Sequence, residues 1–466
     1  MIILSIPYCD PLAAFQVFAA DTYVALLDGF AAYGERRVST LAVDPDHVIL
    51  AGQEGVFIDG QQQDCDTFTA IERVMKNFAV SAVDAAAAPV PFVGGLVGAF
   101  GYELGGCLER LPSPKQGALR LPVLSACVYD TVIAFDHAAR EAWIISHAPD
   151  AEAKSARLAE RLKDAPDYLP PLNWDRGAAW QAEQTRAVVE QSIRRVIDYI
   201  YAGDIFQANV TQRFSAQRPE GLGDFDLYRR LRALNPAPFS AFLRCGDIAL
   251  ASASPERFLR LSADGLIQAQ PIKGTRPRND DPRRDALLAD ELRRSAKDNA
   301  ENLMIVDLMR SDLGRVAELG SVRVPRLNAL ESFASVHHLV STVEGKLRQG
   351  LSAVDLLRAT FPGGSITGAP KIRAMEIIHE LEPSPRGFYC GCLGWIGFDG
   401  AMDMSMTIRT LTITRDKVVA QAGGGIVADS APADEYDECM IKIAPLLRAV
   451  TGETGHDRLA ERRIAG

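Results

Sequence analysis

Acidic side chains recur at helical spacing in two segments that lie far apart along the chain. In "AKDNAENLMIVDLMRSDLG", Asp298 and Glu301 are three residues apart, so a helix would direct both carboxylates to one side. In "DSAPADEYDECMIKIAPLLRAV", Glu435, Glu438 and Lys442 fall on one edge of a helical apolar stripe. Two such helices face to face would gather carboxylates that repel one another, and Mg²⁺ would relieve that repulsion. Solvated helix faces carry the same patterns, so the spacing leaves this alternative open.

A single lysine is the next candidate for chemistry. Lys273 lies in "LIQAQPIKGTRPR", between Pro-Ile and Gly-Thr. A lysine in an exposed loop is usually a solvated charge. Only its surroundings can distinguish such a lysine from one that has a chemical role.

Two further motifs could line a site. In "QAGGGIVADS", the glycines 423–425 stand between a strand and the last helix, and they predict a turn whose N–H groups could hold a carboxylate. An ordinary hairpin or crossover turn would explain the same glycines. In "SVHHLVS", His337 and His338 are adjacent, so on a strand they would point to opposite faces. These two histidines cannot both bind one metal ion.

A helix and a strand precede these motifs and help to position them. The apolar period of "AEQTRAVVEQSIRRVIDYIYAG" predicts an amphipathic helix that stops at Gly203. The next segment, "DIFQANVTQRF", alternates as a strand, and Gln207, Asn209 and Thr211 share one of its faces.

The chain divides by pattern into four parts. Residues 1–145 alternate short β-like runs with turns, and strands and long helices fill 185–450. A charged helix followed by a Pro-rich stretch predicts a connector over 146–184. The polar residues 451–466 predict a tail.

Composition excludes several classes of protein. With 466 residues and 47% hydrophobic side chains, the chain can bury a large core, and its net charge of −10 argues against nucleic acid as a partner. No signal peptide is expected, because "MIILSIPYCDPLAAF" lacks a basic start, and no membrane span is expected either. The eight cysteines are scattered without a CxxC pair, which favours reduced thiols and a cytoplasmic protein.

Several long motifs occur together and in one order. They are "SPERF" (254–258), "PIKGT", "AENLMIVDLMRSDLGRV", "HLVS", "FPGGSITGAPKIRAMEII", "YCGCLGWIG", "MTIRT" and "AGGGIVADS…EYDE", with "PFVGGLVGAFGYELG" upstream. In this combination the chain resembles the chorismate-utilising enzymes, which include the anthranilate, aminodeoxychorismate, isochorismate and salicylate synthases. The resemblance covers most of the chain.

The residue before Gly-Thr distinguishes branches of that family. Lysine at this position resembles the branch that aminates ring carbon 4 of chorismate for p-aminobenzoate and folate biosynthesis, whereas anthranilate synthases typically carry alanine. The resemblance implies that Lys273 is a nucleophile that attacks ring carbon 2 and expels the 4-hydroxyl group, before ammonia attacks carbon 4 and expels the lysine. Such a lysine must be neutral, so its surroundings must lower its pKa.

The same resemblance implies roles for other residues. Glu256 of "SPERF" would be the general acid/base that assists departure of the 4-hydroxyl group. Gln207 stands where isochorismate and salicylate synthases have a lysine that activates water, which argues against water addition. Glu301 and Glu438 would bind Mg²⁺, with Asp298 and Glu435 as their neighbours. The implied substrate contacts are Gln207, Gly274, Thr275, His338, Tyr389, Arg409, Gly424, Gly425 and Lys442.

The fold implied by the resemblance is an α/β (α+β) two-lobed sandwich. Two large, mostly antiparallel sheets would pack together with helices outside, and the active site would lie in the cleft between the lobes. Residues 1–145, the N-terminal lobe, and 185–450, the chorismate-binding catalytic region, would interleave around a shared core.

No glutaminase signature is found in the chain, so a separate glutamine amidotransferase would deliver ammonia.

Two alternatives stay open. One is the first component of anthranilate synthase, whose product is fluorescent and forms without a lyase. The other is a non-catalytic binding or regulatory subunit that has kept the fold. Lys273, Glu256 and both metal-binding carboxylates are present, which argues against the second alternative.

Overall fold

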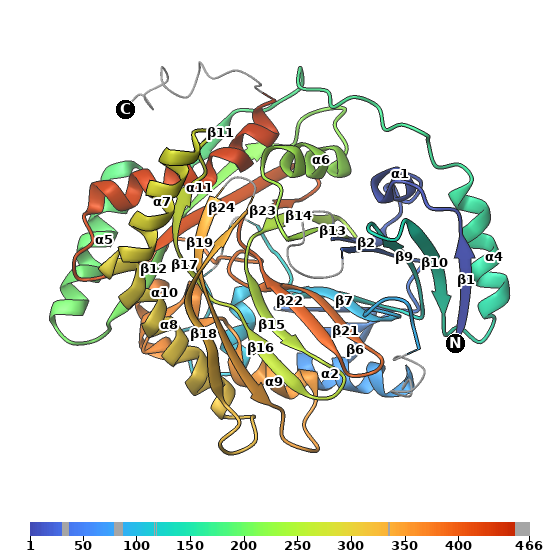
Figure 1. The fold of residues 1–466 in the computed structure, drawn as a ribbon, viewed down its shortest axis with the longest axis horizontal. Helices are drawn as coiled ribbons and strands as arrows, with labels where there is room; N and C mark the ends of the chain where they lie inside the picture. Colours follow the sequence, from blue (N-terminus) through green and yellow to red (C-terminus); the bar gives the residue numbers. More distant parts are fainter. Residues whose placement is uncertain (30–36, 79–86, 116, 118, 334–335, 453–466) are drawn as a thin grey trace.

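The computed structural model describes residues 1–29, 37–78, 87–115, 117, 119–333 and 336–452 (Figure 1). The predicted polar tail therefore lies almost wholly outside the described residues. Within them the chain forms two twelve-stranded sheets, here called sheet A and sheet B, and every strand pairing in both is antiparallel. This confirms the predicted sandwich of large antiparallel sheets with outer helices.

Sheet A takes strands from both ends of the chain. Its order is β1 (Ile2–Ile6), β10 (Glu141–Ser146), β9 (Thr131–Asp136), β3 (Val38–Val43), β2 (Tyr23–Asp28), β13 (Phe239–Cys245), β14 (Ile248–Ser254), β23 (Thr410–Ile413), β24 (Lys417–Ile426), β12 (Gln207–Gln217) and β11 (Trp180–Ala182), with β20 (Gly368–Ala369) paired to β12.

Sheet B also combines strands of 1–145 with strands of 185–450. Its order is β17 (Ile272–Pro277), β19 (Val336–Lys346), β16 (Leu266–Ala269), β15 (Arg257–Leu261), β22 (Met402–Met406), β21 (Cys392–Gly397), β7 (Gly95–Phe100), β8 (Leu124–Tyr129), β4 (His47–Gly52), β5 (Gly55–Ile58) and β6 (Gln61–Gln63), with β18 (Arg323–Ser332) paired to β19. Strands of 1–145 thus pair with strands of 185–450 in both sheets, through β2–β13 and β7–β21.

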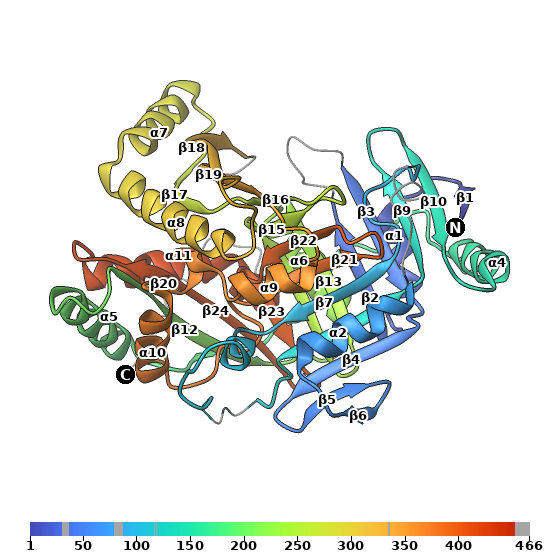
Figure 2. The same ribbon diagram turned by 90° about the horizontal axis from the view of Figure 1, so that it is seen from below.

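Helices cover the outer faces. They are α1 (Pro11–Gln16), α2 (Thr67–Met75), α4 (Ala151–Leu162), α5 (Arg186–Tyr201), α6 (Asp224–Leu234), α7 (Pro282–Arg294), α8 (Ala296–Gly314), α9 (Ala353–Thr360), α10 (Lys371–Leu381) and α11 (Pro432–Thr451), with short 3₁₀ turns η1 (Lys76–Phe78), η2 (Tyr102–Cys107) and η3 (Gly364–Ile366). Figure 2 shows α7 and α8 beside β17, β18 and β19 at one end of the molecule, with α4 and β1 at the other. No helix among the described residues is both long enough and apolar enough to cross a membrane.

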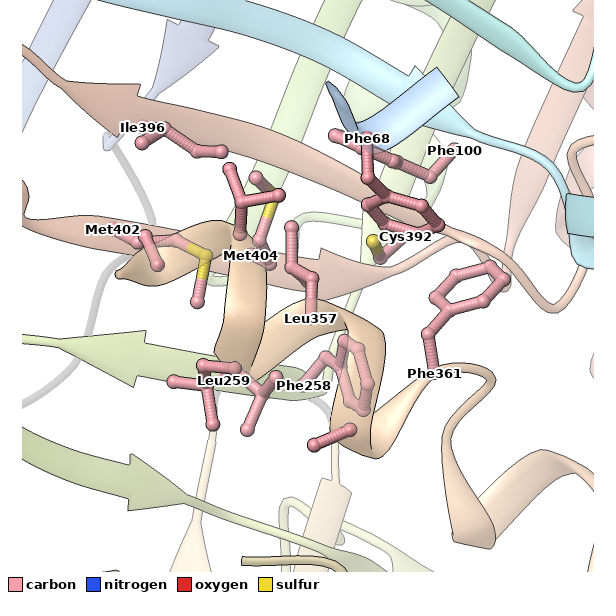
Figure 3. Packing of buried hydrophobic residues seen from close by; sticks show 14 of the residues in the cluster. Phe68, Phe100, Phe258, Leu259, Leu357, Phe361, Cys392, Ile396, Met402 and Met404 are labelled. Carbon is pink, nitrogen blue, oxygen red and sulfur yellow. The ribbon is translucent and has the colours of Figure 1, made fainter. Parts of the chain in front are cut away.

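Among the described residues four apolar clusters hold these layers together, and the smallest lies between α5, α10 and β12. One lies between the sheets and joins Leu243 of sheet A to Tyr129 of sheet B. A second packs α1, α6 and α11 on the outer face of sheet A. The third packs α2, α8 and α9 on sheet B, where Phe68 and Leu357 lie against Cys392 and Met404 (Figure 3). Burial of so much apolar surface is the main stabilisation of the frame that positions the polar site.

Candidate functional site

Lys273 lies on β17, an edge strand of sheet B, next to a bulge at Gly274. Lys273 is opposite Leu339 and Thr275 is opposite His338, so the extra residue places Lys273 and Thr275 on opposite faces of the strand. Gly274 has φ +75°, and a Cβ there would come within 2.8 Å of Leu292, so only glycine fits the bulge. The bulge therefore fixes the direction of the lysine.

The Lys273 ammonium group points into the protein. Its side chain is 13% exposed, and Nζ lies 3.9 Å from Oε2 of Glu301 on α8. Burial lowers the pKa of Lys273 below its usual range; Glu301 opposes this shift and Lys442 adds to it. Lys273 is therefore not a solvated loop charge, and its burial shifts the protonation equilibrium toward the neutral amine.

Glycines on sheet A form the opposite wall. The sequence predicted a turn at 423–425, which was wrong: these glycines belong to β24 and pair with β12. A Cβ on Gly425 would lie 2.3 Å from Nε2 of Gln207 and 3.0 Å from Nζ of Lys273. The glycines are needed because side chains from other segments lie directly against the strand backbone, not because the chain turns.

Gln207, at the start of β12, is fully buried. Neither its amide nitrogen nor its amide oxygen has a hydrogen-bond partner in the part of the chain that the structure describes. Buried amides without partners are costly and uncommon in folded proteins. Gln207 is thus available to hydrogen-bond a ligand between Gly425 and Lys273.

Glu256 lies in the connection from β14 of sheet A to β15 of sheet B, and it is buried. Burial raises the pKa of Glu256 to about 7, although the Ser365 hydroxyl and the charge of Lys273 both favour the carboxylate. A carboxyl group with this pKa keeps its proton up to nearly neutral pH, so it can donate that proton to a leaving group.

We expect Glu256 to titrate near pH 7 and Ser365→Ala to raise its pKa further, because the variant removes a hydrogen bond to the carboxylate. Infrared difference spectroscopy can follow the carboxyl band, with Glu256→Gln as the blank. Titration at the ordinary glutamate value of about 4.3 would contradict the burial argument.

The predicted acidic residues come together where α8 and α11 face each other. Asp298 and Glu301 lie on the first two turns of α8, and Asp298 approaches Arg276 at 3.4 Å. On α11, Glu435 is buried and accepts a hydrogen bond of 2.7 Å from Ser430, while the more exposed Glu438 pairs with Lys442 at 2.6 Å.

Charge and burial affect the pKa values of these carboxyl groups in opposite directions. Burial raises the pKa of Glu301, partly offset by Lys273. Burial would also raise the pKa of Glu438, but Lys442, together with Lys297 and Lys273, outweighs this effect and holds that pKa below its usual range.

The same acidic residues are candidate ligands for a divalent metal ion. No three His, Cys, Asp or Glu side chains in the described ranges converge closely enough to hold an ion. Instead, the ammonium group of Lys297 lies 3.4 Å from Glu435 and 4.0 Å from Glu301, as a cation between the two helices. Carboxylate oxygens are the ligands that Mg²⁺ prefers, so the donor type fits the predicted metal, although the side chains as placed do not converge on one point.

Two further predicted residues, Thr275 and His338, are paired with each other across β17 and β19. Thr275 is exposed, and its hydroxyl group contacts Nδ1 of His338 at 2.9 Å. Burial lowers the pKa of His338 to about 4, which keeps the ring neutral. Its neighbour His337 instead contacts Ser332 and Asp285, in line with the opposite faces predicted for the pair.

Arg409 and Tyr389 come from the segments on either side of β21 and β22. The Arg409 guanidinium donates to the backbone carbonyl of Lys442, and burial lowers the pKa of Arg409. Tyr389 is buried, and burial raises the pKa of its hydroxyl well above the usual value. Gly424 is the last of the predicted residues. A Cβ at this position would lie 3.2 Å from Glu435 and 3.7 Å from Lys442, so the glycine lets both side chains lie close to the strand.

Sequence reasoning missed two residues of this site. Ser365 lies on η3, a turn anchored through the carbonyl of Ile366, which accepts hydrogen bonds from Asn209 and Arg386. Lys297 is the other, and its spacing of four residues from Glu301 was the only signal for it in the sequence.

Comparison with known proteins agrees with the geometry. The family described as chorismate binding enzyme matches residues 30–448. Aminodeoxychorismate synthase component 1 from Klebsiella aerogenes is 42% identical over 95% of this chain and 98% of its own. Anthranilate synthase component 1 from Thermus thermophilus is 46% identical over 77% and 78%.

A solved structure is similar in fold. Anthranilate synthase component I from Streptococcus pneumoniae superimposes with a TM-score of 0.79 and 32% identity, covering 89% of this chain and 93% of that one. With a family match over most of its length and relatives above 40% identity, the chain belongs to the chorismate binding enzyme family.

Proposed function

We propose that the protein aminates chorismate with ammonia to give 4-amino-4-deoxychorismate, through a covalent adduct on Lys273. The observation that carries this proposal is the position of Lys273: its Nζ is buried between Glu301 and the glycine strand, where its pKa is lowered. Relatives named aminodeoxychorismate synthase component 1 support the choice of reaction.

The chemistry divides one substitution into two displacements. The neutral amine of Lys273 attacks ring carbon 2, both conjugated double bonds of the ring shift by one position, and the 4-hydroxyl group leaves as water with a proton from Glu256. Ammonia then attacks carbon 4, both double bonds shift back, and the bond from carbon 2 to the lysine breaks, so that the lysine leaves as the neutral amine. Two displacements retain the configuration, and each has a lower barrier than a single direct substitution.

Other residues of the site bind and orient the substrate. The unpartnered amide of Gln207 would hydrogen-bond it beside Lys273. Glu301 and Glu438, with Asp298 and Glu435 beside them, would hold Mg²⁺, which when bound neutralises the ring carboxylate. Arg409 supplies a positive charge for the second carboxylate of chorismate.

Product identification tests this proposal. Wild-type protein given chorismate, Mg²⁺ and ammonium should form a 4-amino product that mass spectrometry detects and that an added aminodeoxychorismate lyase converts to p-aminobenzoate. Fluorescent anthranilate, formed without the lyase, would favour the second candidate, which the 46% identical anthranilate synthase relative supports. No consumption of chorismate would favour a non-catalytic subunit.

We expect the purified chain to use ammonium, and its rate to rise at alkaline pH in proportion to free NH₃, because ammonia is the nucleophile. The name component 1 in the relatives implies a second component, and we propose that it is a glutamine amidotransferase. Glutamine should therefore support turnover only when such a partner is added. Glutamine-driven turnover by the chain alone would contradict this expectation.

A further inference from the structure

Lys297 lies where two acidic helices approach each other. Its Nζ is 3.4 Å from Oε1 of Glu435 on α11 and 4.0 Å from Oε1 of Glu301 on its own helix, α8. The other oxygen of Glu301, Oε2, is 3.9 Å from Nζ of Lys273. Each oxygen of Glu301 thus faces an ammonium group, and Lys297 links the two helices.

Because the Glu301 and Glu435 carboxylates are largely buried, they need a positive charge such as that of Lys297 between them. The side chains of Glu301 and Glu435 are only 14% and 8% exposed, so their mutual repulsion is weakly screened by water. A positive charge between them offsets this repulsion. Lys297 is 49% exposed, so its ammonium group can leave the carboxylates and enter water without displacing core residues.

We propose that Lys297 is a displaceable cation that occupies the place of the divalent metal and weakens metal binding by competing for Glu301, a proposed ligand, and for Glu435 beside the proposed ligands. This inference rests on the proposed metal site. A metal ion at these carboxylates would be repelled by the ammonium group, so Lys297 must move into solvent before the ion binds. Until then, Lys297 keeps α8 and α11 at the spacing that the site requires.

Lys297 is a better candidate for this role than the other two lysines at the site. Lys442 is paired with Glu438 at 2.6 Å, and its hydrogen bond to the Gly423 carbonyl also fixes its position. Lys273 lies deep beside Gln207 and has a proposed chemical role. The described contacts of Lys297 are to the carboxylates alone.

Calorimetric titration of the protein with Mg²⁺, without chorismate, tests the inference. Lys297→Met keeps the aliphatic stem and removes the charge, so it should bind Mg²⁺ about fivefold more tightly, as expected for loss of a half-exposed ion pair. Lys297→Arg should bind like wild type. The matched control is Lys163→Met, which removes an exposed, ion-paired lysine on another part of the surface and should not change the affinity.

The melting temperature provides a second readout. Without metal, Lys297→Met should melt below wild type because the two carboxylates are left uncompensated, and saturating Mg²⁺ should remove that difference. Equal or weaker Mg²⁺ affinity in Lys297→Met, with wild type binding normally, would overturn the inference and leave the proposed function intact. Wild type that binds no Mg²⁺ would overturn the inference and the proposed metal site together.

Discussion

Glu301→Gln and Glu438→Gln should each lower the rate of chorismate amination by roughly two orders of magnitude, with the larger loss for Glu301. Both variants would remove a proposed anionic ligand from the facing helices, so Mg²⁺ should bind less well and leave the substrate carboxylate without its counter-charge. Glu301 is the more buried of the two and is flanked by Lys273 and Lys297, whereas Glu438 is half exposed.

The dependence of the rate on metal concentration distinguishes a ligand from a structural residue. If Glu438 binds the metal, excess Mg²⁺ should partly restore the rate of Glu438→Gln by mass action. Glu160→Gln, an exposed change on α4, is the control and should match wild type. Near-normal turnover at low Mg²⁺ in either site variant, with an unchanged melting temperature, would refute the assignment.

Lys273→Ala should abolish turnover and leave chorismate binding largely intact. Loss of a covalent step lowers kcat rather than substrate affinity. A solvated lysine would behave differently, since exposed substitutions usually change stability by less than about 0.5 kcal/mol. Lys163→Ala, on the surface, is the control for that case.

Lys273→Arg separates charge from nucleophilicity. Lys273 also compensates the nearby charge of Glu301, so the alanine variant alone could lose activity through a disturbed carboxylate. Arginine keeps the positive charge but stays protonated, and it cannot form the adduct. We expect Lys273→Arg to be as inactive as Lys273→Ala in steady-state assays, and substantial turnover by the arginine variant would show that only the charge matters.

Local pattern was sufficient for several elements of this site. The helical spacing of acidic residues indicated α8 and α11, and it placed Glu301 beside Asp298 on the first and Glu435 beside Glu438 on the second. Alternation predicted β12 and placed Gln207, Asn209 and Thr211 on one face, but it did not predict that Gln207 is fully buried. In both cases the element is defined by the spacing of neighbouring residues, which a single segment contains.

Other features depend on contacts between distant segments. Glycines 423–425 were predicted as a turn because glycine is frequent in turns, but their role is to let Gln207, Lys273 and Glu435 approach the strand. The bulge at Gly274 is defined only by its register with β19. Lys297 has its closest carboxylate 138 residues away, so no local pattern could reveal the pair.

The most direct test of the account is product analysis of Lys273→Ala, given chorismate, Mg²⁺ and saturating ammonium, beside wild type under the same conditions. Mass spectrometry, together with lyase treatment and anthranilate fluorescence, separates amination at ring carbon 4 from amination at ring carbon 2. If Lys273 is the nucleophile, the variant should form no 4-amino-4-deoxychorismate, and any residual amination should occur at carbon 2, which the lysine no longer blocks. Wild-type amounts of the 4-amino product from Lys273→Ala would contradict it.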